Sequence, residues 1–168
     1  MTLNHVPKLS QDNPTGCCPR FNPKGWDGQT FEFKDKPFVR LTVRSFFYIP
    51  LNMGSVITKA MKQVEAAGAA NKSENIMLSF DLSPWKSEHF LAVTKNVPGM
   101  ENVQFSGTYL AKVFEGPFQN APKWIAEMKQ FVASQNKTAK KIYLNYTMCP
   151  KCSKFYGKNY VVAFAQLT

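Results

Sequence analysis

An internal repeat is the feature of this sequence that most constrains its fold. When the chain is aligned with itself, Phe47 falls on Phe114 and Pro50 falls on Pro117. Order, spacing and residue character continue to agree downstream. The aligned segments are 44–52 with 111–119, 76–80 with 142–146, and 90–93 with 160–163. A duplicated unit of this size predicts two similar halves built into one domain.

Each copy has the pattern of a strand, a helix and two further strands. Aromatic and β-branched residues predict first strands at 39–47 and 108–114, and the later apolar segments predict a hairpin in each copy. Helical spacing of apolar residues predicts a helix in each copy, with Gly68 ending the first and Pro122 near the start of the second. The expected buried stripes are Val56, Ile57, Ala60, Met61 and Val64, and Trp124, Ile125, Met128, Phe131 and Val132.

These elements predict an α+β fold. Two pseudo-symmetric β-α-β-β repeats, at about 38–100 and 101–168, are expected to form an antiparallel sheet that carries two helices and leaves a central cleft. Residues 1–37 lie outside the repeat and are rich in proline, yet they include Trp26. We therefore expect an irregular N-terminal arm packed against the duplicated domain at 38–168.

Charge and hydropathy exclude several classes of protein. The chain of 168 residues carries a formal net charge of +10, which attracts anions. Its lysines are scattered, however, with the densest groups at 137–141 and 151–154, so a nucleic-acid partner is not expected. No apolar run reaches the 18 residues of a spanning helix, and no secretory signal is recognisable. We expect a cytoplasmic location and no membrane partner.

Two short motifs resemble the DNA gyrase inhibitor-like (SOUL/effector-binding) small-molecule-binding superfamily. One is the step Gly116-Pro117-Phe118 between strand and helix, and the other is Tyr143-Leu144-Asn145 in the following strand. More closely, the chain is similar to an uncharacterised bacterial group whose members are often labelled hydrolases. The segments that carry this likeness are 17–19, 44–46, 113–117, 149–152 and 156–162.

The resemblance implies a cleft between the repeats that accepts apolar, often cationic, small molecules. Some relatives sense drugs as parts of transcription regulators, and some hydrolyse strained rings. Members that bind cations often have a glutamate where this sequence has Lys141. A lysine there disfavours a cation and suits a neutral or anionic ligand.

Glu115 is the leading candidate for acid–base chemistry. It ends a predicted strand directly before the Gly-Pro turn, where a side chain can point into a cleft. A carboxylate held among aromatic residues becomes a usable general base near neutral pH. Tyr143 or Tyr48 would then donate to the opening or leaving group. The alternative is an exposed carboxylate, or an acceptor that caps the turn.

The rest of the predicted cleft comes from aromatic and polar residues near both copies' strand ends. Lys141, Tyr143 and Asn145 alternate with Ile142 and Leu144, so they share one strand face. If the intervening residues meet a helix, this face meets the ligand. The predicted ligand-binding residues are Phe47, Tyr48, Trp85, Phe114, Lys141 and Asn145.

Four cysteines form two close pairs, Cys17-Cys18 in the arm and Cys149 with Cys152 in a predicted hairpin loop. Four readings stay open: a structural zinc ion held by all four, a disulfide, a redox dithiol, or unlinked thiols. Zinc best explains why an arm and a loop both carry pairs. A thioredoxin-like dithiol is disfavoured because that motif opens a helix, whereas this one lies between predicted strands.

Two functions from different classes follow. The first is binding of an apolar or amphipathic small molecule in an aromatic cleft, with or without its hydrolysis by Glu115 and a tyrosine. The second is a non-catalytic, zinc-stabilised protein that contacts a macromolecule. A serine nucleophile elbow, a phosphate-binding loop and a zinc-protease motif are all missing from the sequence.

Overall fold

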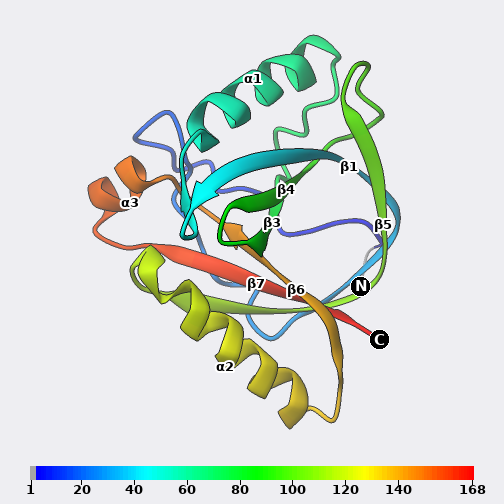
Figure 1. Cartoon of the computed structure of the whole chain (residues 1–168), viewed down its shortest axis with the longest axis vertical. Helices are drawn as coiled ribbons and strands as arrows, with labels where there is room; N and C mark the ends of the chain where they lie inside the picture. Colours follow the sequence, from blue (N-terminus) through cyan, green and yellow to red (C-terminus); the bar gives the residue numbers. More distant parts are fainter. Residues whose placement is uncertain (1–2) are drawn as a thin grey trace.

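The computed structural model describes residues 3–168 and contains an antiparallel sheet that closes into a barrel (Figure 1). The seven strands run in the order β2-β1-β4-β3-β6-β7-β5, and β1 also pairs with β5, which closes the ring. They are β1 (Thr30–Phe46), β2 (Ile49–Pro50), β3 (Met77–Ser83), β4 (Lys86–Ala92), β5 (Glu101–Glu115), β6 (Ala139–Tyr146) and β7 (Tyr160–Leu167). The predicted α+β class with an antiparallel sheet is confirmed.

Strand β1 closes the barrel because it is long enough to pair with both β4 and β5. Its residues 30–40 pair with β5, and its residues 38–44 pair with β4. The register with β5 shifts between Phe33 and Lys36, where Asp35 adopts a left-handed φ of 50°. Such an irregularity bends a strand and increases its twist, as a closed sheet requires.

Three helices pack around this sheet: α1 (Met53–Ala66), α2 (Ala121–Ser134) and α3 (Pro150–Tyr156), with a short 3-10 turn at Phe118–Asn120. Figure 1 shows α1 and α2 on opposite sides of the barrel. The predicted stripe of α2 is buried at Trp124, Met128 and Val132. In α1, Ala60 and Val64 are buried, but Met61 is 43% exposed. The prediction for Met61 was wrong, because α1 buries a narrower face than its apolar pattern indicates.

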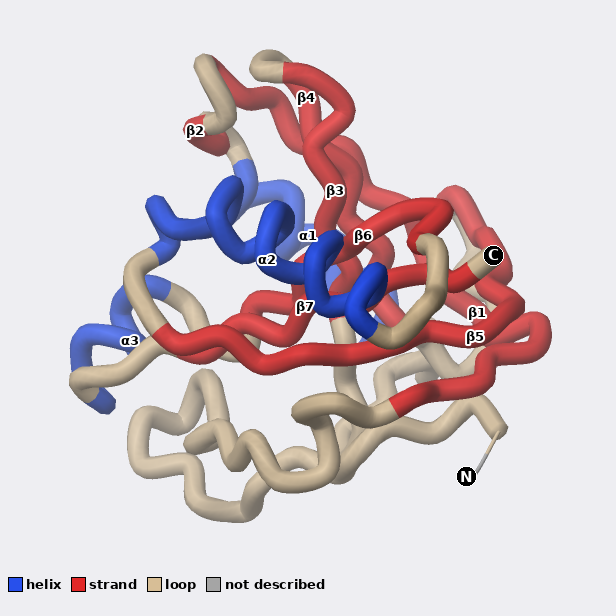
Figure 2. The backbone as a smooth tube through the Cα atoms, turned by 90° about the horizontal axis from the view of Figure 1, so that it is seen from below, coloured by secondary structure: helices blue, strands red, loops and turns tan. Residues whose placement is uncertain are grey.

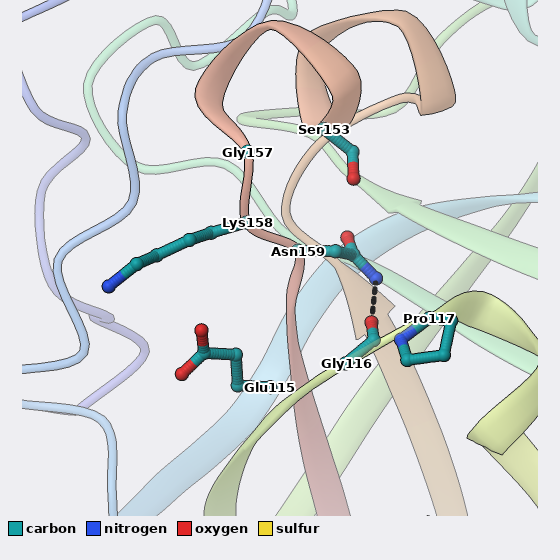
Figure 3. A pocket seen from close by; sticks show the side chains of 7 residues that line it. All are labelled: Glu115, Gly116, Pro117, Ser153, Gly157, Lys158 and Asn159. Carbon is teal, nitrogen blue, oxygen red and sulfur yellow. Dashed lines mark hydrogen bonds between the residues drawn. The ribbon is translucent and has the colours of Figure 1, made fainter.

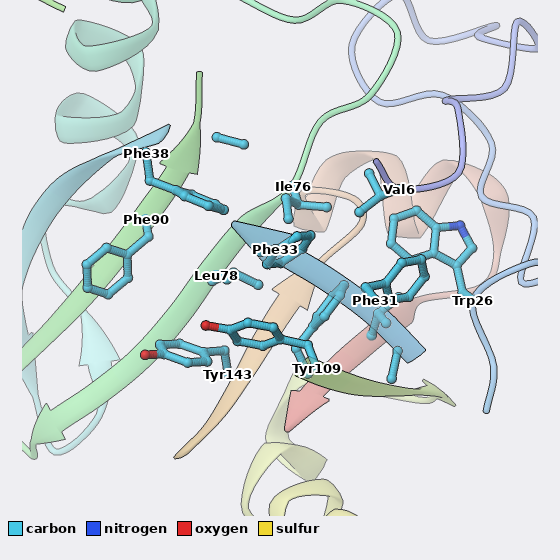
Figure 4. Packing of buried hydrophobic residues seen from close by; sticks show 14 residues of the cluster. Val6, Trp26, Phe31, Phe33, Phe38, Ile76, Leu78, Phe90, Tyr109 and Tyr143 are labelled. Atoms are coloured by element: carbon cyan, nitrogen blue, oxygen red, sulfur yellow. The ribbon is translucent and has the colours of Figure 1, made fainter. Parts of the chain in front are cut away.

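Aromatic side chains fill the inside of the barrel (Figure 4). Alternation along each strand directs one set of residues inward and the other toward a helix. On β4, for example, Phe90 and Ala92 join the inner cluster, whereas Leu91 packs with Val64 of α1. Since Phe38 and Phe164 are fully buried, the inner side chains occupy much of the space in which a central cleft was predicted.

The order strand, helix, strand, strand occurs twice, as β1-α1-β3-β4 and β5-α2-β6-β7. Within the sheet the two groups meet through the β3–β6 and β1–β5 pairs. The pseudo-symmetric duplication itself stays a prediction. Helix α3 was not predicted, and it interrupts the expected hairpin between β6 and β7.

Residues 3–29 are irregular and cover one end of the barrel (Figure 2). Val6 and Trp26 are buried in the inner cluster, and the Trp26 ring centroid lies 5.9 Å from that of Phe31. Residues 30–37, expected to belong to the irregular arm, are the start of β1. Their alternation, Thr30-Phe31-Glu32-Phe33, is that of a strand with one buried face. Among residues 3–168, no helix has the length and apolar character needed to cross a membrane.

Candidate ligand site and cysteine cluster

A buried carboxylate, Glu88, lies on the inner face of the barrel. It is two residues before Phe90 on β4, so its side chain shares the inward face, and the residue is only 6% exposed. Its Oε2 lies 2.9 Å from Nη1 of Arg40, whose Nη2 lies 3.0 Å from Oε1 of Glu101. Glu88 is not recognisable from the sequence, because nothing in a single strand reveals the cross-strand arginine that makes its burial tolerable.

Tyr143 lies close to this ion pair, within a group of rings. Its ring centroid is 5.6 Å from that of Phe105 and 6.1 Å from those of Phe80 and Phe90. Burial, together with the negative charge of Glu88, raises the pKa of Tyr143 to about 12. The phenol is therefore protonated at neutral pH and can donate a hydrogen bond. In Figure 4 its hydroxyl points in the same direction as that of Tyr109.

The part of this inner face around Tyr143 is not closed off completely. Phe80, Phe105 and Lys141 are only partly buried, and the Lys141 Nζ lies 4.0 Å from the centroid of the Phe80 ring. Neither Tyr109 nor Tyr143 forms a side-chain hydrogen bond with another residue of the described chain. The arrangement therefore offers ring faces for apolar contact, together with phenol, ammonium and carboxylate groups for polar contact.

Three predicted site residues lie on β6. Two of them, Lys141 and Tyr143, belong to the group of rings, and the third, Asn145, holds β3 instead. Tyr143 and Lys141 face the same rings, since Lys141 Nζ lies 5.2 Å from the Tyr143 centroid. The intervening Ile142 and Leu144 pack in the cluster around α2, which fulfils the condition set for Tyr143 and Asn145 to share the opposite face. Asn145 is buried, and its Oδ1 accepts a hydrogen bond from the Met77 backbone N at 3.0 Å, which links β6 to β3.

Glu115 lies in a different place. It is exposed at the end of β5, beside an open depression of about 360 Å³ that Lys158 and Asn159 also line (Figure 3). Asn159 holds this end of the strand by donating from Nδ2 to the Gly116 carbonyl at 2.9 Å. Glu115 is thus an exposed carboxylate rather than one enclosed by aromatic residues.

The structure does not bring Glu115 and Tyr143 together. Tyr143 pairs with Phe164 of β7, which in turn pairs with Ala111 of β5. Glu115 lies four residues further along β5, about 13 Å away in the strand direction. A proton relay between these two side chains would need a substrate that spans this distance.

The remaining predicted ligand-binding residues lie elsewhere. Phe114 is buried on the outer side of the sheet, with its ring centroid 6.0 Å from that of Trp124 in α2. Phe47, Tyr48 and Trp85 are exposed by 61%, 57% and 51% at the turns β1–β2 and β3–β4. Phe47 and Trp85 thus lie together at exposed turns, whereas Phe114 lies on the outer face of β5 against α2, so none of them joins the rings around Tyr143.

The four cysteines meet at one place, where the N-terminal arm crosses α3. Their four Sγ atoms all lie within 4.8 Å of one another. The backbone N of Cys149 donates to Cys18 Sγ at 3.4 Å, and the Tyr156 hydroxyl donates to the Cys18 carbonyl at 2.6 Å. Two segments far apart in the sequence therefore form one sulfur cluster.

The prediction of a hairpin loop around Cys149 and Cys152 was wrong, because this segment begins a helix. Cys149 is the N-cap of α3, Pro150 occupies the first turn, and Cys149 Sγ accepts from the backbone N of Cys152 at 3.5 Å. Proline is favoured at a first helical position, and this local signal indicated the helix start. The motif thus opens a helix after a strand, so its position no longer disfavours a redox dithiol.

The thiols differ in their environments. A hydrogen bond with Thr15, at 3.4 Å, is the main cause that lowers the pKa of Cys152 to about 6. Burial raises the pKa of Cys18. The cluster thus contains a thiol that readily becomes a thiolate, the form that binds metals and attacks disulfides.

Comparison with known proteins places this α+β barrel among proteins labelled as hydrolases. The sequence matches the family described as "Bacterial hydrolase" over residues 8–167, and the chain belongs to that family. Because the match spans both the arm and the barrel, it includes the cysteine cluster and the inner face. The broader resemblance to gyrase inhibitor-like domains stays a prediction. No curated protein matches the chain.

Two solved structures, both from Listeria innocua, share the fold. An uncharacterized conserved protein is similar with a TM-score of 0.60 at 13% identity, covering 83% of this chain and 91% of that one. A protein described as a hydrolase is similar with a TM-score of 0.56 at 14% identity, covering 86% of this chain and 94% of that one. At such low identity the likeness establishes the fold alone.

Proposed function

We propose that this protein binds a small amphipathic molecule on the inner face of its barrel, with Glu88 as the polar centre. The observation that carries the proposal is a carboxylate that is only 6% exposed, next to a group of aromatic rings. Burying a charge is costly unless the group is paired, and Arg40 provides the pair at 2.9 Å.

The chemistry of the ligand follows from the groups that surround it. The partly buried rings of Phe80 and Phe105 would contact a flat or branched apolar portion. The Lys141 ammonium, 4.0 Å above the Phe80 ring, favours a neutral or anionic polar group. The Tyr143 phenol would donate a hydrogen bond to an oxygen of the ligand. We infer a compact ester, amide or carboxylic acid with an apolar portion.

The family label makes hydrolysis the reaction to test. Glu88 would take a proton from a water molecule, whose oxygen attacks the substrate carbonyl carbon. Tyr143 would donate a hydrogen bond to the developing oxyanion, and Glu88 would return the proton to the leaving group. If the chain is a duplication, the first copy supplies the base and the second the phenol. Glu115 is the alternative carboxylate, acting at its own depression.

Hydrolysis of p-nitrophenyl butyrate, an amphipathic ester, would test the proposed reaction. Glu88→Gln and Tyr143→Phe should each reduce kcat/KM by about 100-fold, the usual contribution of a general base. Glu127→Gln, which alters a partly exposed α2 carboxylate, is the matched control and should leave the rate unchanged. A loss in Glu115→Gln with Glu88→Gln unaffected would move the reaction to the depression beside α3.

Binding without turnover needs a separate readout. Titration of ¹⁵N-labelled protein with butyrate and p-nitrophenol, the two products, should shift the amides around Glu88 and Tyr143. If the shifts cluster instead at Glu115 or at the β1–β2 turn, the inner-face site is wrong. Shifts at the inner face without ester hydrolysis identify a binding protein rather than an enzyme.

For the cysteine cluster we propose a structural zinc ion. A tetrahedron with Zn–S distances of about 2.3 Å places its sulfurs about 3.8 Å apart. The Sγ atoms of Cys17 and Cys18 lie 3.7 Å apart, and all four sulfurs lie within 4.8 Å. The donor set therefore needs little rearrangement. The ion would tie the arm to α3, and a reducing, cytoplasmic location would keep the thiols available.

Metal analysis of the purified protein tests the zinc proposal independently of the ligand site. We expect close to one equivalent of zinc, lost in Cys152→Ser and retained in the neighbouring Ser153→Ala. Less than a tenth of an equivalent after reconstitution with zinc would overturn the proposal. A mass two hydrogens lower than the thiol form, with no metal, would instead identify a disulfide.

A further inference from the structure

The exposed apolar residues of the described chain gather mainly at one end of the barrel. We call this group the aromatic tip. It consists of residues exposed by 47–67%, namely Phe46, Phe47, Tyr48, Ile49, Leu51, Leu82 and Trp85. They come from two turns that are joined by hydrogen bonds from the Tyr48 N to the Pro84 carbonyl, at 2.9 Å, and from the Ser45 N to the Trp85 carbonyl, at 2.8 Å. Figure 2 shows both turns projecting from the same end of the barrel.

The rings of the aromatic tip pack against one another rather than into the core. The Phe47 ring centroid lies 4.8 Å from that of Phe46 and 4.9 Å from that of Trp85. Single exposed apolar residues are common on protein surfaces and need no explanation. A contiguous group of this size marks an interaction surface.

The backbone of the β1–β2 turn has a conformation that is unfavourable for the two aromatic residues in it. Phe47 and Tyr48 occupy the two central positions of the turn with φ angles of 45° and 68°. A two-residue hairpin turn with both φ angles positive strongly favours Asn-Gly, because bulky side chains are strained there. The sequence places two aromatic residues at positions where they weaken the turn, and an external contact would compensate for that strain.

Positive charge borders the aromatic tip. Arg44 and Lys86 are cross-strand partners at its base, and both are exposed. Neither belongs to an ion pair within residues 3–168, whereas Arg40, four residues earlier on β1, is bound to two carboxylates. Asp81 is the acidic residue nearby, opposite Ser87 in the β3–β4 ladder. The chain as a whole carries a formal net charge of +10.

We propose that the aromatic tip inserts into the interfacial region of an anionic lipid bilayer. Phenylalanine, tryptophan and tyrosine side chains on a projecting turn suit the boundary between lipid headgroups and acyl chains. Arg44 and Lys86 would then lie at the level of the anionic headgroups, where basic residues bind most strongly. The sequence predicted no membrane partner because it contains no long apolar run, whereas this surface is assembled from two short turns.

The test uses vesicles of phosphatidylcholine, with and without one third phosphatidylglycerol. We expect the protein to co-sediment with the anionic vesicles about tenfold more strongly than with the neutral ones, a ratio that falls at high salt. Trp26 and Trp124 are 5% and 3% exposed, so a change in tryptophan emission reports on Trp85. Its emission should shift to shorter wavelength, and brominated lipid should quench it.

Two pairs of variants separate insertion from general attraction of charge. Phe47→Ser should reduce vesicle binding about tenfold, whereas Phe155→Ser, which alters an equally exposed ring on α3, should not. Arg44→Gln with Lys86→Gln should remove the preference for anionic lipid, and Lys137→Gln with Lys140→Gln should preserve it.

Three outcomes overturn the proposal. The first is the absence of binding to both kinds of vesicle. The second is equal vesicle binding by Phe47→Ser and the unmodified protein, which would show that net charge alone attracts the protein to the vesicles. The third is a dimer in solution that Phe47→Ser converts to a monomer, which would assign the aromatic tip to a second copy of the chain.

Discussion

The Arg40 guanidinium holds the buried Glu88 carboxylate at 2.9 Å across neighbouring strands of the barrel. The Arg40 side chain is 39% exposed, whereas that of Glu88 is only 9% exposed. Glu88 depends on Arg40 more than Arg40 depends on Glu88, because the arginine also contacts water and Glu101. Removing the arginine leaves a buried carboxylate without its partner.

Arg40→Gln should therefore destabilise the protein by about 1.5–5 kcal/mol, the range from a lost charged hydrogen bond to a broken buried pair. Urea unfolding at neutral pH measures the change. Lys123→Gln breaks an exposed pair with Glu127 at 3.8 Å and is the control, with an expected cost below about 0.5 kcal/mol. Equal effects of the two variants would show that Glu88 does not need Arg40.

Glu88→Gln should lower the pKa of Tyr143 from its value of about 12. Burial raises this pKa and would persist in the variant, but the carboxylate charge that disfavours the phenolate would be gone. NMR titration of ¹³C-labelled tyrosine measures the shift. An unchanged Tyr143 titration in Glu88→Gln would mean that the two groups are not electrostatically coupled.

The buried His89 predicts a dependence of stability on pH. Its Nδ1 lies 2.7 Å from Ser79 Oγ and its Nε2 2.9 Å from Ser87 Oγ, and burial lowers its pKa from 6.5 to about 4. Between these values the unfolded chain binds the proton and the folded chain does not, so stability rises with pH. The effect is about 3 kcal/mol, complete above pH 6.5 and lost as pH falls toward 4. Urea unfolding between pH 4.5 and 7.5 should show a steeper slope in the unmodified protein than in His89→Gln, and identical slopes would refute the assignment.

The two methionines of the predicted helix stripes should differ in their contribution to stability. Met128 in α2 is fully buried, whereas Met61 in α1 is 43% exposed. Met128→Ala should cost about 2–5 kcal/mol, since it leaves a cavity between helix and sheet. Met61→Ala should change the free energy of unfolding by less than about 0.5 kcal/mol. Thermal unfolding of both variants compares them directly, and a large loss in Met61→Ala would contradict the observed packing.

Gly116, directly after Glu115, is required by its backbone conformation. Its φ is 146°, and a Cβ there would lie 3.1 Å from Asn120 Nδ2. Gly116→Ala should cost about 1–3 kcal/mol. Gly54→Ala in α1, where a Cβ meets nothing within 4 Å, should instead stabilise by about 0.5 kcal/mol. Chemical denaturation of the pair tests this, and a stabilised Gly116→Ala would exclude the left-handed turn.

The sequence was sufficient for the parts of the fold that depend on local pattern. Apolar segments after each predicted helix located the strands that contain Tyr143 and Phe90, and helical spacing located α2 with its buried Trp124. The pattern at 142–146 also gave the correct faces of β6, because a strand with a helix on one side must alternate.

The candidate site was predicted less well because it depends on pairing between distant strands. Glu88 was missed since its partner, Arg40, lies in another strand, and neither residue is unusual in its own segment. Glu115 was favoured for its position before a glycine, but that same turn ends β5 at the surface. A cluster of all four cysteines was one of four readings of the sequence, and the helix that begins at Pro150 was not predicted.

The pairing of β1 with β5 joins Thr30 to Leu110 and so closes a large loop of the chain. Local hairpins such as β3–β4 need little loop closure, but this contact is entropically costly until most of the sheet exists. We therefore expect ring closure to be the late, rate-limiting step of folding. Until it occurs, both strand edges are open to other chains, so nascent protein is most prone to aggregate just before its two longest strands meet.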